Sequence, residues 1–254
     1  MTTLFYEHDE TGNRIGVPVS GQVPAYPDGA RMDGHWCYLE RLTADHADGL
    51  VNVLSGHHRN WVWLPYGPID DATAMRDWID AFANGDDPLF YVVRRQTDDL
   101  IMGLLSYLRI DPANRSIEVG HINFAPIMQQ TPAATEAVSL LMKAAFAYGY
   151  RRFEWKCNIL NDKSCRAAER FGLSFEGVFR QAALPKGHNR DTGWFAAIDS
   201  DWPPLKANFE AWLHPDNFDA DGQQKQSLYD LNAKHLVRRF ADAGYQYEEH
   251  KKTT

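Results

Sequence analysis

Apolar residues recur in two periods along this chain, one typical of strands and one typical of helices. Runs with the spacing or length of strands lie at residues 36–42, 89–94, 100–109, 117–124, 153–157, 174–180 and 192–198. Apolar positions three and four residues apart predict helices over residues 43–54, 75–82, 132–148 and 161–171. The order β-α-α-β-β-β-α-β-α-β-β predicts an α/β domain with a mixed sheet over residues 35–200.

The helix at 132–148 has the clearest boundaries. Thr131 fits the N-cap, Pro132 fits the first helical position, and Gly149 fits the stop. A strand at 117–124 feeds this helix through a short loop of small and polar residues. Because the first helical N–H groups lack partners, such an end can hold a phosphate. A core helix without a ligand explains the same residues equally well.

Two flanking segments complete the predicted organisation. Residues 1–34 are rich in Gly, Pro and Asp and are expected to form an irregular arm. Residues 201–254 are expected to form a helical extension that caps the domain or mediates a homodimer. In that extension Trp202-Pro203-Pro204 is expected to break the chain, and residues 228–240 are expected to be helical.

Composition narrows the function classes. The chain has 254 residues, a formal net charge of −8 and a sequence pI of about 5.6, which argue against a nucleic-acid footprint. It contains neither a membrane-spanning apolar run nor a signal-peptide pattern at its first residues. Cys37, Cys157 and Cys165 show no metal-ligand spacing and fit a reducing, cytoplasmic location. Cys165 is expected to be a buried thiol rather than a nucleophile.

Several motifs occur together in one order and spacing. They are Glu118-Val119-Gly120-His121, residues 129–137, Asn161-Asp162-Lys163-Ser164, Phe171-Gly172-Leu173 and Phe175-Glu176-Gly177. In this arrangement residues 35–200 resemble the GNAT (Gcn5-related) N-acetyltransferases, and most of all their ribosomal-protein N-terminal acetyltransferase (RimJ/RimL-like) branch. The resemblance implies a GNAT fold with splayed parallel strands, acetyl-CoA as cosubstrate, an amine as acceptor and no metal.

The resemblance also implies a CoA-binding loop. Its residues are Gln129, Gln130, Thr131, Ala133, Ala134 and Thr135, with the backbone of Phe124 and Ala125 offered to the pantetheine arm. Pro132 stands where the family pattern has glycine, and it removes one N–H donor. The N–H groups of Thr131, Ala133 and Ala134 are expected to face the phosphates instead.

In the resembling branch, a serine protonates the leaving thiolate and an asparagine contacts the CoA arm. These positions are Ser164 and Asn161 here. The position of the tyrosine acid found in other family members is Ala168. Ser164 could instead hydrogen-bond a carbonyl of its own helix, and Asn161 could act as a plain N-cap.

The general base is less clear, because the branch's glutamate falls on Ala183. Glu118 is the first remaining candidate, and Asp191 with His188 is the next. An ordinary ion pair for Glu118, a polar hairpin for Asp191, and proton transfer through ordered water are the alternatives.

Candidate acceptor contacts are the aromatic residues Trp63, Tyr66 and Trp155 and the cation Arg180. Core packing of the aromatics and an internal ion pair of Arg180 are the alternatives. The leading hypothesis is acetyl transfer to a small or amino-acid-like amine. Protein N-terminal acetylation and a non-catalytic acyl-CoA sensor or scaffold are the competing hypotheses.

Overall fold

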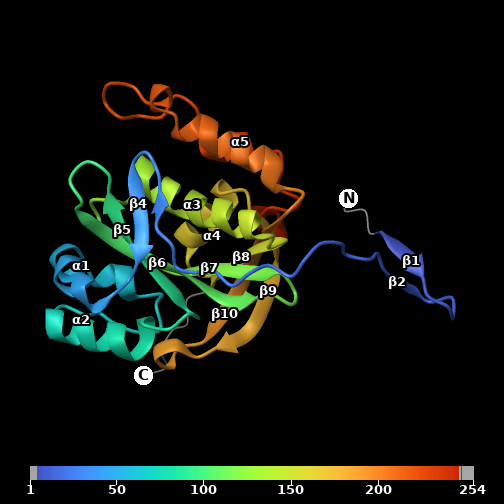
Figure 1. The fold of residues 1–254 in the computed structure, drawn as a ribbon, viewed down its shortest axis with the longest axis horizontal. Coiled ribbons are helices and arrows are strands. Elements are labelled where there is room, and N and C mark those ends of the chain that lie inside the picture. Colours follow the sequence, from blue (N-terminus) through green and yellow to red (C-terminus); the bar gives the residue numbers. More distant parts are fainter. Residues whose placement is uncertain (1–4, 246, 248–254) are drawn as a thin grey trace.

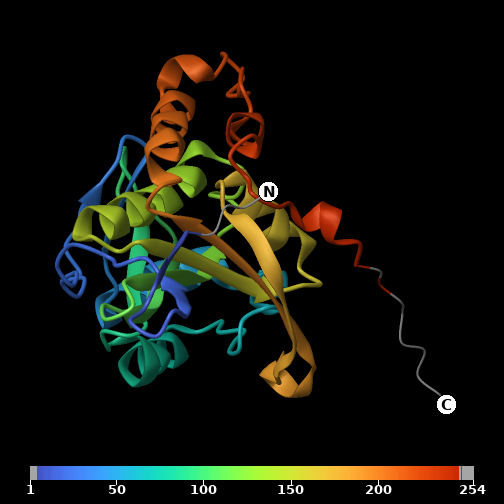
Figure 2. The same cartoon turned by 90° about the vertical axis from the view of Figure 1, so that its right-hand side faces the viewer.

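Eight strands form one mixed sheet in the computed structural model, which describes residues 5–245 and 247 (Figures 1 and 2). They are β3 (Met32–Asp33), β4 (Cys37–Arg41), β5 (Leu89–Arg95), β6 (Ile101–Asp111), β7 (Ser116–Phe124), β8 (Arg152–Asn158), β9 (Ser174–Ala183) and β10 (Arg190–Ile198). Their spatial order is β3-β4-β5-β6-β7-β8-β10-β9. Only β7 and β8 pair in parallel within this sheet, as their strand–helix–strand connection predicts.

Helices cover both faces of the sheet. They are α1 (Ala47–Leu54), α2 (Ala72–Trp78), α3 (Pro132–Tyr148), α4 (Asp162–Arg170), α5 (Trp202–Leu213) and α6 (Leu228–Ala233). From β4 to β10 the order of strands and helices agrees with the predicted order, and the α/β class with a mixed sheet is confirmed.

Alternation along the strands separates two apolar cores. Tyr91 and Val93 of β5 belong to the core that packs against α3 and α4. Phe90 and Val92 belong to a second core with α1 and α2. Figure 1 shows α1 and α2 grouped together, apart from α3 and α4. The sheet therefore presents one face to each helix pair.

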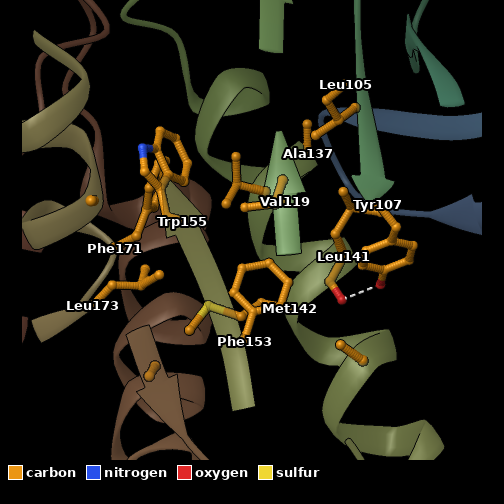
Figure 3. Close-up of a cluster of buried hydrophobic side chains, with 14 of the residues drawn as sticks. Leu105, Tyr107, Val119, Ala137, Leu141, Met142, Phe153, Trp155, Phe171 and Leu173 are labelled. Carbon is orange, nitrogen blue, oxygen red and sulfur yellow. Dashed lines mark hydrogen bonds between the residues drawn. The ribbon is translucent and has the colours of Figure 1, made fainter. Parts of the chain in front are cut away.

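The start and end of α3 follow the predicted signals. Pro132 occupies the first turn, and Gly149 ends the helix with a φ of 94°, which favours glycine. The apolar face of α3 packs on β7 and β8 (Figure 3). The Tyr107 hydroxyl of β6 donates a hydrogen bond to the Leu141 carbonyl of α3. Helix and sheet are thus joined by apolar contacts and by a polar one.

Glu136 ties the first turns of α3 to the start of β4. Its carboxylate accepts hydrogen bonds from the backbone N–H groups of His35, Trp36 and Cys37, at 2.7, 2.7 and 2.8 Å. The residue is 5% exposed. A Cβ at Gly34 would lie 2.3 Å from the Glu136 carboxyl carbon, so only glycine fits there. This contact fixes where the chain enters the sheet.

The N-terminal arm differs from the expected irregular segment. Two three-residue strands, β1 (Tyr6–His8) and β2 (Arg14–Gly16), form a hairpin that stands apart from the sheet in Figure 1. The Asp9 carboxylate closes its turn by accepting from the N–H groups of Thr11 and Asn13. Strands this short carry too few residues for a periodic signal.

The C-terminal extension differs at two points. Trp202-Pro203-Pro204 does not break the chain but forms the first turn of α5, because proline suits positions whose N–H has no helical acceptor. The expected helix at 228–240 is shorter and ends at Ala233. The following backbone bonds to the body instead: Val237 N–H donates to Ser174, and Arg238 C=O accepts from Phe175 N–H.

We expect Glu136→Ala to lower the free energy of unfolding by about 2–3 kcal/mol, because the buried N–H of Cys37 and the partly buried hydrogen bonds from His35 and Trp36 lose their acceptor, at about 1–3 kcal/mol for a buried donor. Urea denaturation measures the change. Lys143→Ala, at an exposed position of the same helix, is the matched control. A loss below about 1 kcal/mol would mean that water replaces the carboxylate at little cost.

Candidate functional site

β7 and β8 pair over only part of their length. Their parallel register runs from Ser116 with Arg152 to Val119 with Trp155. Beyond these residues β7 pairs only with β6, and β8 pairs only with β10. A register shift between β6 and β7 lies at this point, where His121 adopts a φ of 51°. The two central strands therefore separate and leave an opening between them.

The end of β7 lines this opening. Ala125 N–H donates to Met102 C=O of β6, so strand alternation directs the backbone groups of Phe124 away from β6. The Phe124 carbonyl accepts from the side-chain amides of Asn60 and Gln129, at 3.0 and 2.8 Å. The Ala125 carbonyl accepts from two N–H groups of the following turn. The backbone of Phe124 is thus directed away from β6, with its carbonyl bonded to two side chains, whereas the backbone groups of Ala125 are occupied by the main chain.

Of the N–H groups expected to face a ligand in the loop before α3, that of Ala133 is free within the described residues and those of Thr131 and Ala134 are not. Thr131 N–H donates to Met128 C=O, and Ala134 N–H donates to Thr131 C=O. The prediction that these two N–H groups face a ligand is therefore contradicted. In the part of the chain that the structure describes, the N–H groups of Gln130 and Ala133 have no acceptor. They lie at the positive end of the helix dipole, as an anion site requires.

Gln130 and Thr135 lie on either side of the start of α3. Gln130 adopts a φ of 62°, a left-handed conformation that glycine adopts more easily. Thr135 is buried, and its hydroxyl accepts from the Arg170 guanidinium at 3.0 Å. Burial lowers the pKa of Arg170 to about 10. The hydroxyl of Thr135 therefore joins α3 to α4 and does not point out of the protein.

Ser164 lies in the first turn of α4 and contacts β8. Its hydroxyl oxygen accepts from the Trp155 indole N–H at 2.9 Å, and its backbone N–H donates to the Asn161 side chain at 3.2 Å. Asn161 is thus the helix N-cap. With the indole as donor, the Ser164 hydroxyl keeps its own proton for another acceptor.

Trp155 therefore does not take the predicted position at the acceptor. Its ring is 6% exposed and packs beside Phe171 in the core with α3 and α4 (Figure 3). Residue 155 points to that face because Glu154 and Lys156 point to the other. The structure makes Trp155 a positioning residue for Ser164.

The cysteines near Ser164 are free and buried. Cys157 and Cys165 have their sulfur atoms 3.6 Å apart. The hydrogen bond between the two thiols, and after it burial, raises the pKa of Cys165 far above the usual range of a thiol. Cys165 therefore stays protonated, in agreement with the expected non-nucleophilic thiol.

Glu118 lies below the opening, where β7 and β8 still pair. Its carboxylate is 3% exposed and accepts from Arg109 and Lys156, each at 2.8 Å. Lys156 also contacts Glu154, at 2.6 Å, and lies over the Trp194 ring. These contacts make Glu118 part of a buried ion-pair network and weigh against its predicted role as the base.

Arg180 and Asp191 lie together at the tip of the β9–β10 hairpin. With Gln181 and Asn189 they line a shallow hollow of about 520 Å³. The Asp191 carboxylate accepts from Gln181 N–H and Asn189 Nδ2, and the first of these bonds contributes most to lowering the pKa of Asp191. Asp191 therefore stabilises the hairpin turn, which weighs against its predicted role as the base.

Tyr66 and His121 form the wall of the opening on the side of α1 and α2. The Tyr66 hydroxyl hydrogen-bonds His121 Nδ1 at 3.1 Å, and the two rings stack with centroids 5.6 Å apart. Trp63, in the same loop, is partly exposed. Lys186 in the β9–β10 connection donates to the Trp61 carbonyl at 2.8 Å, which joins the segments flanking the two sides of the opening.

Three residues at the opening were not predicted: Asn60, His121 and Arg190. His121 lies within one of the recognised motifs, but only the folded backbone shows its left-handed φ and its contact with Tyr66. Asn60 and Arg190 come from a loop and a strand start distant in sequence from β7. Nothing in their local sequence distinguishes them from surface residues.

Across residues 5–245 and 247, His, Cys, Asp and Glu side chains form no group of three or more that could hold a metal ion. Each helix within those residues is too short or too polar to cross a membrane.

Comparisons with known proteins agree on one family. The profile described as an acetyltransferase (GNAT) domain matches residues 37–174. The crystal structure of a GCN5-related N-acetyltransferase from Brucella melitensis superimposes with a TM-score of 0.81 at 42% identity, over 84% of this chain and 98% of that chain. A second structure, of a probable GNAT-family acetyltransferase from Chromobacterium violaceum, has a TM-score of 0.70 at 38% identity, over 74% and 96%.

A curated relative is also similar. The ribosomal-protein-serine acetyltransferase of Escherichia coli K12 is 29% identical over 101 residues, which are 40% of this chain. The chain spans 56% of the length of that relative.

We expect His121 to make stability depend on pH. Burial, followed by the charges of Arg109 and Arg190, lowers the pKa of His121 from 6.5 to about 4. A neutral buried imidazole contributes stability above pH 6.5 that is lost as the pH falls toward 4, up to about 3 kcal/mol. Urea denaturation at pH 7 and pH 4.5 should show a smaller difference for His121→Phe than for the wild type.

The exposed His57 supplies the control for this comparison. His57→Phe should keep the pH difference of the wild type. Equal differences for all three proteins would show that His121 does not carry this dependence.

Proposed function

The chain belongs to the GNAT acetyltransferase family, and on that premise we propose that it transfers the acetyl group of acetyl-CoA to the primary amine of a small, amino-acid-like molecule. The observation that carries the proposal is the opening between β7 and β8. At its two sides lie an anion-binding helix start and a serine hydroxyl with a free proton. These are the parts that a CoA thioester needs.

In this proposal the pyrophosphate lies against the N–H groups of Gln130 and Ala133 at the start of α3. The pantetheine arm lies along the open edge of β7, where its amide N–H replaces the side-chain amides of Asn60 and Gln129 at the Phe124 carbonyl. Pro132 has no backbone N–H to donate. The backbone N–H of Gln130, a residue with a left-handed φ, supplies a donor in its place. Asn161 caps α4 and holds Ser164 beside the arm.

The proposed reaction is direct attack of the neutral amine on the thioester carbonyl. The carbon–nitrogen bond forms, the carbon–sulfur bond breaks, and the products are an N-acetylated amine and CoA. Ser164 gives its proton to the leaving thiolate. The Trp155 indole stabilises the serine oxygen as this proton leaves, because it already donates to that oxygen.

The amine proton needs an acceptor in the opening. Glu118 and Asp191 stay predictions for this role, although both carboxylates are occupied in ion pairs or turn hydrogen bonds. His121 is neutral at pH 7 because burial lowers its pKa to about 4. One nitrogen bonds Tyr66, so the other is left to take the proton from the tetrahedral intermediate, whose ammonium is a much stronger acid than the free amine.

A second candidate is acetylation of a protein N-terminus, favoured by the similarity to the ribosomal-protein-serine acetyltransferase. The ribosomal-protein branch has a glutamate as its base at the position that is Ala183 in this chain. The absence of a carboxylate at position 183 weighs against this candidate. A third is an acyl-CoA sensor that kept the fold, suggested by Pro132. Release of CoA thiol across a panel of small amines and N-terminal peptides separates the first two. Tight acetyl-CoA binding without turnover of any acceptor would favour the sensor.

Substitutions at Gln130 test the cofactor loop. Gln130→Pro removes an N–H and cannot adopt a φ of 62°, so the Kd for acetyl-CoA should rise at least about tenfold. Gln130→Gly keeps the N–H and relieves the backbone, so affinity should be retained. Calorimetry measures both. An unchanged Kd for a folded Gln130→Pro protein would place the phosphates elsewhere.

Ser164 and Trp155 should act as one unit. Ser164→Ala should lower kcat by about 10²-fold while leaving acetyl-CoA affinity nearly unchanged. Trp155→Phe should lower kcat less, and it should add little in the Ser164→Ala background, because the same proton donor is affected. Additive losses in the double variant would separate the indole from the acid.

A further inference from the structure

Arg190, at the start of β10, is a half-buried cation without a carboxylate. No salt bridge joins its guanidinium to any acid in residues 5–245 and 247. Burial lowers the pKa of Arg190. A charge removed from water without a partner is costly, and such groups normally hold a ligand or an ion pair.

The hydrogen bonds of Arg190 leave part of its guanidinium free. Nε donates to the Thr192 hydroxyl at 3.1 Å, and Nη2 donates to the Lys156 carbonyl at 3.5 Å. Nη1 has no acceptor among the described residues. The bonds to Thr192 and Lys156 fix the plane of the guanidinium group. Its remaining N–H groups are therefore held in place for a ligand that carries two oxygen atoms.

Arg190 lies on the β8 side of the opening. Its acceptor Lys156 directly follows Trp155, the last residue of β8 that pairs with β7. Thr192 and Trp194 alternate with it on the same face of β10, the face that carries Lys156. This face is opposite α3 and α4, so Arg190 looks toward the acceptor side and away from the core that holds Trp155.

His121 marks the other side of the same space. The charges of Arg109 and Arg190 both act on its imidazole, so both guanidinium groups lie within electrostatic range of it. Glu118 contacts Arg109 and Lys156 directly, each at 2.8 Å, and acts on Arg190 only from a greater distance. Arg190 is therefore the cation on this side that no carboxylate of the described residues contacts directly.

We propose that Arg190 binds an anionic oxygen group, a carboxylate or a phosphate, carried by the acceptor amine. This inference rests on the proposed acetyltransferase function and narrows its substrate class to anionic amines such as amino acids. The guanidinium supplies two parallel N–H donors to the anion and sets the amine toward the opening. Arg180 is less suited, because Asp191 lies beside it in an exposed hollow and offsets its charge.

Matched acceptors test the proposal. We compare phenylalanine with phenylalaninamide, and phosphoethanolamine with ethanolamine, each with acetyl-CoA and the full-length protein. Phenylalaninamide and ethanolamine carry the amine without the anionic group. Phenylalaninamide has the larger neutral-amine fraction, so a preference for phenylalanine cannot come from amine reactivity. Wild-type kcat/KM should favour at least one anionic partner about 10- to 100-fold, and the favoured pair tells carboxylate from phosphate.

Three variants assign the preference to Arg190. Arg190→Gln should raise KM for the anionic acceptor about 10- to 100-fold with little change in kcat, and should leave the neutral partner unaffected. Arg190→Lys should restore part of the preference, because it keeps the charge without the fork. Arg151→Gln, at an exposed position before β8, should match the wild type. A merely structural role for Arg190 would lower activity toward both partners alike.

Failure of the inference differs from failure of the proposed function. Equal turnover of anionic and neutral partners by the wild type overturns the role of Arg190 and leaves the acetyltransferase function standing. If no acceptor is turned over, calorimetry of the same four compounds against the CoA-saturated protein decides. Anion-dependent binding that Arg190→Gln abolishes supports the inference, and its absence overturns it.

Discussion

The separation of β7 from β8 is the constraint on which the rest of the site depends. Parallel strands normally pair along their full common length, because each unpaired backbone group in a sheet interior loses a hydrogen bond. Here pairing stops at Val119 and Trp155, and the left-handed residue His121 marks the point. The exposed edge is stabilised from outside the sheet: Asn60 and Gln129 cover the Phe124 carbonyl, and Lys186 joins the flanking segments through Trp61.

Charge is distributed differently below and above this point. Below it, Glu118 bonds two cations, and Lys156 bonds two carboxylates, so the buried charges balance where the strands pair. Above it, burial keeps His121 neutral, and no carboxylate of the described residues forms a salt bridge with Arg190, although the charge of Glu118 acts on it from a greater distance. The charges in the paired region thus neutralise one another, whereas the open region has a cation that is available to bind an anion. The same sheet face serves as support at one end and as a binding surface at the other.

The two faces of β8 divide the chemistry in a similar way. Trp155 points into the core with α3 and α4 and bonds the Ser164 hydroxyl, whereas Lys156 points to the acceptor side and bonds Arg190 through its carbonyl. Adjacent residues of β8 thus support Ser164 on one face of the sheet and Arg190 on the other. This explains why Trp155, an aromatic residue typical of a binding pocket, is a positioning residue: its position in the alternation decides its role.

Much of the fold and part of the site could be predicted from local sequence. Pro132 and Gly149 bound α3, Asn161 caps α4, and the strand–helix–strand order makes β7 and β8 parallel, because each depends on neighbouring residues and on backbone geometry. The expected helix at 228–240 failed because Val237 and Arg238 exchange hydrogen bonds with β9, a contact across the chain. The short hairpin of β1 and β2 gave no periodic signal.

The amino-acid sequence by itself determined the α/β order, the helix that starts at Pro132, and the cap of α4 by Asn161 beside Ser164. Only the tertiary structure decided which loop N–H groups are free, that Glu118 and Asp191 are occupied, and that Arg190 and His121 face one opening. The reason is physical: helix starts and strand alternation are set within a few residues. The availability of a charge or a donor depends on which partners the folded backbone brings into contact, from 9 residues away for Glu118 and Arg109 to 64 for Asn60 and Phe124.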